Sequence, residues 1–237
     1  MRYRMLLLAG VLLLAWPFGA VAQVGGTWGF GVAASYDLPT FKLNEWFPSG
    51  GVNLGGTALY VLDERWTAEV EGHYIKYSGG ELENRTFLWS IDKQEYASPQ
   101  ASSKMTWMGG TISWLYHFNQ GGKKLAEGGG RAPYLVVGTG YVKDKNEISG
   151  LIWPGQPAPP LNENLLLEPT ADQHMTLGLN VGLGVQFFTS QSLAIDLRGQ
   201  YNIVLGSVRP LEAWGMEEVF PFQKLNVGVR FKFYTQQ

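Results

Sequence analysis

The sequence predicts an all-β protein, an eight-stranded antiparallel up-and-down transmembrane β-barrel. Three observations predict it: a two-residue alternation of side chains, charges confined to one face of the alternating segments, and an N-terminus typical of exported proteins. The alternation is clearest in residues 175–187, where odd positions from Met175 to Phe187 are large and apolar and even positions are small or polar. A period of two places these sets on opposite faces of a strand. So long an apolar face suits lipid on one side and a polar lumen on the other.

The N-terminus has the features of a secretory signal peptide. Arg2 and Arg4 precede an apolar run that ends in Ala20-Val21-Ala22, the small residues of a cleavage site. We therefore expect cleavage near Ala22. The chain then divides into a signal peptide, residues 1–22, and one barrel domain, residues 23–237.

Composition excludes several classes of protein. Without Arg2 and Arg4 the mature chain has 16 Lys and Arg against 20 Asp and Glu, a net charge of about −4, whereas nucleic-acid-binding proteins present a basic surface. The absence of Cys excludes disulfides, thiolate metal sites and a Cys nucleophile. Charged residues make up only 16% of the sequence, while 31 Gly and 14% aromatic residues favour a membrane barrel.

The first half of the chain contains four alternating segments. They span residues 26–36, 51–62, 66–77 and 104–118. In the first two, the face opposite the large apolar residues is built mainly from Gly, Ala, Ser, Asn and Thr, and in the third it carries Glu69, Glu71 and His73. The fourth is less regular, because Trp107 and Leu115 fall on the face opposite to the other large residues. We expect a bulge at Gly109-Gly110 to change the phase there.

The second half contains four more. They span residues 133–143, 175–187, 193–205 and 222–234. The first two place glycines opposite their large side chains. The last two place charged residues there instead, and no charge lies among the residues that we assign to the outward faces. A Lys or Arg facing lipid at the midplane costs about 2–4 kcal/mol, so a bilayer enforces this segregation.

The connections alternate in length, which predicts short periplasmic turns and long extracellular loops. The expected turns are residues 63–65, 119–132 and 189–192, and the expected loops are residues 37–50, 78–103, 144–172 and 206–219. The connection over 119–132 is long for a periplasmic turn.

The inward charges are the most prominent candidate site. They are Glu69, Glu71, Asp196, Arg198, Lys224, Arg230 and Lys232. A barrel of eight strands is just wide enough for side chains to fill it. We therefore expect an ion-paired network that plugs the lumen, since buried charges need partners. The alternative is a narrow pore whose conductance depends on switching these pairs.

The long loops carry large apolar residues that could bind a partner. They are Phe87, Trp89, Tyr96, Ile152, Trp153 and Leu166. Exposed apolar clusters mark contact with a partner or a membrane. The alternative is that the loops fold over one another and cover the barrel mouth.

The three histidines, His73, His117 and His174, are scattered and show no metal-binding spacing. His174 and Thr176 share one face of a strand, but no third catalytic group accompanies them. We expect no catalytic residue, no metal site and no cofactor, and a non-enzymatic protein.

The signal peptide, the eight alternating strands, the aromatic rims and the aromatic-rich segment Leu225–Tyr234 resemble the small eight-stranded bacterial outer-membrane barrels of the OmpA/OmpX/OmpW type. The resemblance implies a bacterial outer-membrane location, contact with outer-membrane lipid including lipopolysaccharide, and recognition of the last strand by the barrel-assembly machinery. It implies a structural or partner-binding role without nucleic acid. A narrow channel for small or apolar solutes and an accessory subunit of a larger envelope complex remain alternatives. The alternative at the level of fold is a soluble lipocalin-like barrel, with apolar faces inward.

Overall fold

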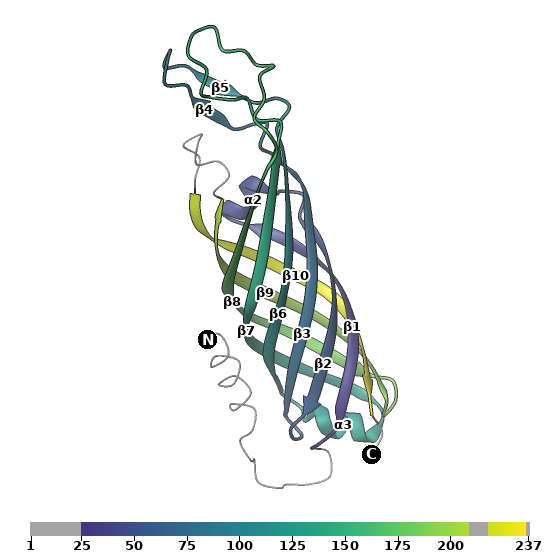
Figure 1. Ribbon diagram of the computed structural model, residues 1–237. Helices are drawn as coiled ribbons and strands as arrows, with labels where there is room; N and C mark the ends of the chain where they lie inside the picture. Colours follow the sequence, from purple (N-terminus) through teal and green to yellow (C-terminus); the bar gives the residue numbers. More distant parts are fainter. Residues whose placement is uncertain (1–24, 209–217, 236–237) are drawn as a thin grey trace, which may run out of the picture.

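The chain forms a closed barrel of eight antiparallel strands, seen in a computed structural model that describes residues 25–208 and 218–235 (Figure 1). The strands are β1 (Trp28–Thr40), β2 (Gly51–Val61), β3 (Trp66–Gly80), β6 (Ser102–His117), β7 (Gly130–Ser149), β8 (Thr170–Phe188), β9 (Leu193–Val208) and β10 (Glu218–Tyr234). Each pairs with its neighbours along the chain, and β1 pairs with β10 to close the wall. The predicted fold class is confirmed. The predicted signal peptide, residues 1–22, lies outside the described residues.

Strands β7 and β8 are 20 and 19 residues long, well beyond the predicted 133–143 and 175–187. Their additional residues keep the two-residue alternation, but outward positions such as Lys143, Lys145 and Gln173 are polar. Both ends of the segment expected as a loop, residues 144–149 and 170–172, are therefore strand, because the hydrogen-bonded ladder continues past the apolar part of the wall.

The expected bulge at Gly109-Gly110 is wrong. Strand β6 keeps one continuous register with β3 from Tyr116 to Met105, straight through both glycines. Trp107 and Leu115 stay in phase and are fully buried inside the barrel. The lumen accepts large apolar side chains at these levels, so no change of phase is needed.

Three smaller features lie at the two ends of the barrel (Figure 1). Helix α2 (Lys42–Trp46) and a hairpin of β4 (Thr86–Leu88) with β5 (Glu95–Ala97) lie at the end with the long loops. Helix α3 (Gly121–Glu127) lies at the opposite end, within the connection expected as a periplasmic turn. Among the described residues, no helix has the length and apolar character needed to cross a membrane.

The outward face between the two ends is an apolar belt bordered by aromatic rings. At the end with α3, Trp28 packs on Tyr60 with ring centroids 4.8 Å apart, and Trp66 packs on Tyr116 at 5.0 Å. Toward the other end, the exposed outward residues include Tyr36, Tyr74 and Tyr141. Between these rings the wall exposes large aliphatic side chains, most fully on β8 at Leu177, Leu179 and Leu183.

Candidate functional site

Six of the seven predicted lumen charges meet in one cluster inside the barrel, closer to the end with α3 than to the end with the long loops. They are Glu69 and Glu71 from β3, Asp196 and Arg198 from β9, and Arg230 and Lys232 from β10. All six residues are buried. Three carboxylates face three cations, so the cluster is formally neutral.

Arg198 is the centre of this cluster. Its Nη1 lies 2.6 Å from Glu69 Oε1, and its Nη2 lies 3.0 Å from Asp196 Oδ2. Its Nε donates to the hydroxyl of Tyr134, 2.6 Å away, and that hydroxyl donates to Asp196 Oδ1 at 2.6 Å. The planar guanidinium thus donates in three directions at once, which suits Arg better than Lys.

The two cations of β10 complete the pairing. Lys232 Nζ lies 2.6 Å from Glu69 Oε2 and 2.8 Å from Asp196 Oδ2. Arg230 Nε lies 3.0 Å from Glu71 Oε2, and its Nη2 donates to Gln200 Oε1 at 3.2 Å. Strands β1, β2 and β8 contribute small residues at these levels. Gly184, for example, lies against the ring of Tyr134.

The seventh predicted charge, Lys224, lies apart from the cluster. Its Nζ pairs with Asp37 Oδ2 at 2.8 Å and stands over the ring of Trp107, 4.6 Å from the centroid. Asn226 Nδ2 donates to Asp37 Oδ1 at 2.7 Å. The first predicted strand, residues 26–36, ends before Asp37, so Asp37 was not among the predicted lumen charges. The signal was its parity with Gly29 and Ser35, which places it on the inward face of the same strand.

A small polar cavity separates the two groups of charges. Its polar lining consists mainly of Asn53, Glu71, His73, Asn180, Gln200, Asn202, Lys224 and Asn226, and the apolar residues Val142, Leu179 and Val204 also border it. The volume open to the centre of a water molecule is about 30 Å³. That is room for about two or three waters and for no larger solute.

The end with α3 is closed by an apolar layer. Leu125 of α3 is buried in a cluster with Leu59, Val61, Ala132, Phe188, Ala194 and Tyr234. Two hydrogen bonds hold the helix across this end: Gly122 N donates to Glu64 O at 3.0 Å, and Gln191 Nε2 donates to Ala126 O at 2.7 Å. Glu64 and Gln191 come from the two short turns, so all three turns are linked.

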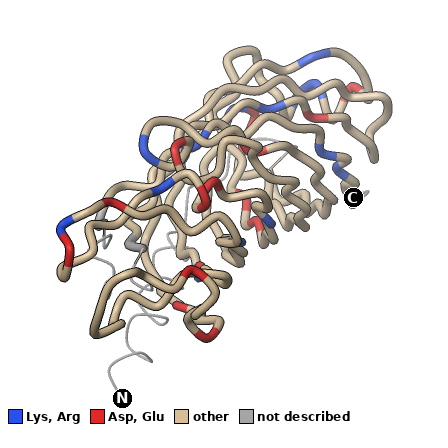
Figure 2. The backbone as a smooth tube through the Cα atoms, turned by 90° about the horizontal axis from the view of Figure 1, so that it is seen from above, with Lys and Arg blue, Asp and Glu red and all other residues tan. Residues whose placement is uncertain are grey.

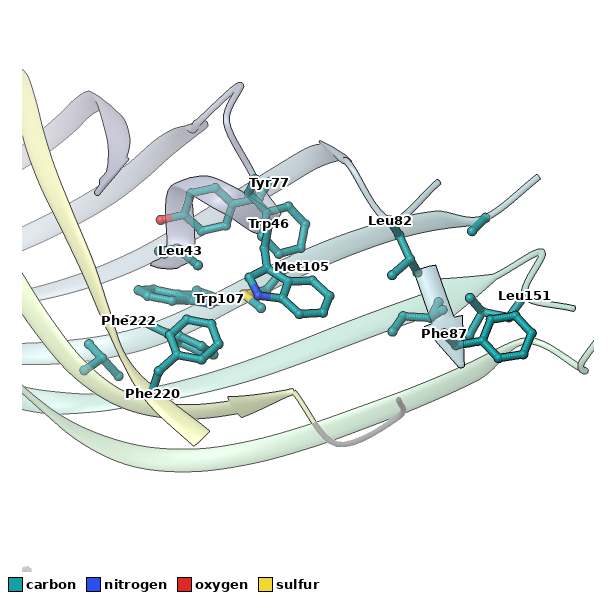
Figure 3. Packing of buried hydrophobic residues seen from close by; sticks show 14 of the residues in the cluster. Leu43, Trp46, Tyr77, Leu82, Phe87, Met105, Trp107, Leu151, Phe220 and Phe222 are labelled. Atoms are coloured by element: carbon teal, nitrogen blue, oxygen red, sulfur yellow. The ribbon is translucent and has the colours of Figure 1, made fainter. Parts of the chain in front are cut away.

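The other end is closed by aromatic side chains (Figure 3). Trp107 stacks on Phe222 with centroids 5.7 Å apart and meets Tyr77 edge-on at 5.5 Å. Leu43 and Trp46 of α2 are buried in the same cluster. Figure 3 shows these side chains gathered across the mouth, with Leu82, Phe87 and Leu151 forming a second group farther out along the loops.

The loop residues predicted to contact a partner divide into two sets. Phe87, Trp89 and Ile152 are buried, so the expectation that they form an exposed cluster is wrong. Trp89 Nε1 donates to Pro154 O at 3.0 Å, and Ile152 N donates to Ser98 Oγ at 3.2 Å, which joins the two long loops to each other. Burying their apolar side chains together stabilises the loops more than exposing them would.

The remaining three reach the surface to different degrees. Trp153 and Leu166 are exposed, with 41% and 37% of their surface accessible. Tyr96 is half-buried against Trp89, with centroids 5.9 Å apart. The hydrogen bond that its hydroxyl donates to the Asp92 carboxylate, at 2.6 Å, raises the pKa of the phenol.

The histidines lie at three separate levels. His73 lines the polar cavity, His117 is within 3.3 Å of Thr67 Oγ1 near α3, and His174 pairs with Asp172 beyond the apolar belt. Within the part of the chain that the structure describes, no three His, Cys, Asp or Glu side chains converge in a way that could hold a metal ion.

Comparisons with known proteins found no matching family model and no matching curated protein. Among solved structures, this chain is similar to a major outer membrane protein from Thermus thermophilus, with a TM-score of 0.48 and 10% identity over 88% of this chain and 99% of that one. It is similar to Ail, the attachment invasion locus protein of Yersinia pestis, with a TM-score of 0.45 and 13% identity over 89% and 98% of the two chains. It is also similar to Neisserial surface protein A, with a TM-score of 0.44 and 14% identity over 87% and 96%.

Proposed function

We propose that this chain is a non-enzymatic, integral barrel of the bacterial outer membrane that is closed to solutes and acts as a structural or partner-binding protein. The single observation that carries the proposal is the difference in polarity between the two faces of the barrel wall. The outward face of the belt is apolar, whereas the inward face holds ion-paired charges and amides. A soluble barrel would have these faces reversed.

The dimensions of the belt support a membrane-spanning role. About eight residues separate Trp28 from Tyr36 on β1 and Trp66 from Tyr74 on β3. At roughly 3.3 Å per residue and a tilt of roughly 40°, the two aromatic rings lie about 20 Å apart along the barrel axis. The apolar band of outer-membrane barrels is about 25 Å tall, with aromatic girdles at both edges.

Three successive layers support a closed lumen: the Leu125 layer, the neutral ion-pair cluster, and the aromatic layer around Trp107. The intervening cavity is too small for any solute larger than a few waters. A narrow channel for small or apolar solutes would need all three layers to move.

Partner binding is supported by apolar residues that remain exposed on the loops. Leu88 and Ile91 lie in the β4–β5 hairpin region, and Trp153, Leu165 and Leu166 lie in the connection between β7 and β8. Lipid of the outer membrane, including lipopolysaccharide, would contact the belt. The barrel-assembly machinery would meet the last strand, β10, during insertion.

The location is tested by fractionating cells that express the full chain. We expect the protein in the outer-membrane fraction, released by detergent and not by high salt or carbonate. Recovery in the aqueous fraction without detergent would contradict the membrane role. The two long loops should be cut by protease added outside intact cells, while α3 should be cut only after the envelope is opened.

The closed lumen is tested by reconstitution into planar bilayers. We expect no conductance steps from the wild-type protein or from Lys224→Ala, because Lys224 contacts only the aromatic layer, at Trp107, and the Leu125 layer and the ion-pair cluster still block the lumen. Steps that Lys224→Ala changes would support the channel instead. Purification in mild detergent tests the alternative of an accessory subunit, for which a stoichiometric protein partner is expected.

A further inference from the structure

Four lysines project from the outer wall directly beyond the aromatic ring that includes Tyr74 and Tyr141. They are Lys76 on β3, Lys104 on β6, and Lys143 and Lys145 on β7. We call them the outer lysine cluster. All four occupy outward positions of their strands, in phase with the apolar residues of the belt.

The strand register gathers the outer lysine cluster around one hydroxyl. Thr106 of β6 is directly opposite Lys76 on one side and Lys145 on the other. Lys104 lies two residues farther along β6, and Lys143 lies two residues from Lys145 on β7. Because adjacent strands are about 4.8 Å apart, Lys76 and Lys145 flank Thr106 with roughly 10 Å between their Cα atoms. Long lysine side chains reach across such a gap.

The cluster is confined to one sector of the barrel. At the corresponding level, the outward residues described on the other five strands are uncharged. They are Leu38, Val52, Gln173, Leu205 and Gln223. Lysines that merely keep the rim of the wall hydrated would be spread around the ring. Acidic and basic positions are otherwise intermingled along the molecule (Figure 2).

Little in the described chain neutralises these cations. Glu147 Oε1 pairs with Lys145 Nζ at 2.5 Å. Lys76, Lys104 and Lys143 form no side-chain hydrogen bond or ion pair with any residue that the structure describes. Lys104 is directly opposite Glu147 in the register of β6 and β7. The hydrogen bond from Lys145, and then the charges of Lys145, Lys104 and Lys76, lower the pKa of the Glu147 carboxyl. The site keeps a net charge of about +3.

A hollow and an apolar surface adjoin the cluster on its two sides. The hollow, of about 440 Å³, is lined by Lys104, Glu147, Ser149 and Thr170 among others, and lies on the side of the loops. On the side of the belt, Met108 and Met175 flank Lys143 in the same cross-strand row and are exposed by 56% and 71%. The site is thus polar and cationic on the side of the loops and apolar on the side of the belt.

We propose that the outer lysine cluster binds the phosphorylated headgroup of an outer-leaflet lipid, whose acyl chains lie on Met108 and Met175. This inference rests on the proposed membrane location, because only a lipid presents a phosphate at the edge of the apolar belt. Ammonium groups pair with phosphate oxygens, and the Thr106 hydroxyl donates to one of them. Lysines at a membrane surface each add to the attraction for anionic lipid.

The test is a binding competition with purified protein in detergent. Diphosphoryl lipid A and phosphatidylethanolamine are offered at equal concentration, and the bound lipid is quantified by native mass spectrometry. The variant carries K76Q, K104Q, K143Q and K145Q. The matched control carries R65Q, K123Q, K124Q and R131Q, which removes four positive charges at the end with α3, three of them exposed and that of Lys124 partly exposed.

We expect the wild type and the control to prefer diphosphoryl lipid A over phosphatidylethanolamine. In the variant, the ratio of the two bound lipids should fall at least tenfold. Equal preference in all three proteins would overturn the proposal. Inorganic pyrophosphate at the same phosphate concentration should fail to displace the lipid. Displacement of the lipid by pyrophosphate would show that the site binds free phosphate and would overturn the proposal of a lipid ligand. If the variant still enters the outer-membrane fraction, loss of lipid A binding tests this site alone, whereas failure of the wild type to reach that fraction rejects the proposed function.

Discussion

At the scale of residues, the ion pairs of the lumen decide which substitutions the barrel tolerates. Glu69 is shared by Arg198 and Lys232, and both of those cations also contact Asp196. None of these groups can reach bulk water from its buried position. Losing one partner therefore leaves a buried charge, which costs more than the pair itself contributes.

Glu69→Gln should destabilise the barrel by about 3–5 kcal/mol, because it leaves Arg198 and Lys232 to share Asp196, with only a longer contact of 3.9 Å between Arg198 Nη1 and Glu71 Oε2 besides. The measurement is the urea midpoint of the protein folded into lipid vesicles. The control is Glu127→Gln, whose partner Lys124 is partly exposed, and which should change the midpoint little. Equal shifts for the two variants would show that the lumen cluster is hydrated rather than buried.

Glycine at position 184 is required by a close approach. A Cβ there would overlap the ring and hydroxyl of Tyr134, which is held by Arg198 and Asp196. Gly184→Ala should therefore cost about 1–3 kcal/mol through overpacking. Gly199→Ala, on the outward face of β9 with no atom within 4 Å of its Cβ, should leave stability unchanged in the same urea titration.

At the scale of elements, the strands were predictable and the end caps were not. The two-residue period identified all eight strands, and the bounds predicted for β2 and β9 differ from the observed ones only at one end. Helices α2 and α3 have five and seven residues, and nothing in so short a segment distinguishes a helix from a turn. Their conformation is set by burial of Trp46 and Leu125 at the barrel ends, which are tertiary contacts.

The same reason explains which parts of the candidate site were missed. Alternation along a strand predicted that Arg198 and Arg230 point inward. It does not predict which inward charges lie at the same height along the barrel axis. That depends on the stagger between strands, which places Lys224 with Asp37 and away from Glu71. For Phe87 and Trp89, the sequence shows apolar loop residues without showing the second loop that covers them.

Helix α3 offers a separate prediction. Leu125→Ala should destabilise the barrel by about 2–4 kcal/mol, because Leu125 fills a closed apolar layer. It should still give no conductance in planar bilayers, since the ion-pair cluster blocks the lumen above it. Lys123→Ala, exposed on the same helix, is the control for stability. Ion flow through the Leu125→Ala barrel would show that α3 is the principal seal.

At the scale of the whole molecule, closure depends on β10, which pairs with β9 over nearly its full length and with β1 from Gln223 to Tyr234. Val229 lies opposite Ala34 on one side and Leu197 on the other. Val229→Pro removes a backbone donor in a strand without an edge, so the wall should fail to close. Val229→Ile keeps the donor and should close normally. Protease protection in vesicles distinguishes the two, and full protection of the proline variant would contradict the closed wall.

The lumen pairs also connect distant parts of the chain. Glu69 and Arg198 are 129 residues apart, Glu71 and Arg230 are 159 apart, and Asp37 and Lys224 are 187 apart. In each of these pairs, the acid on β1 or β3 is synthesised well before its partner cation on β9 or β10. A chain interrupted before β9 would hold carboxylates with no counter-charge and could not shield them from lipid. Only a polypeptide that includes β9 and β10 therefore neutralises the carboxylates of the lumen.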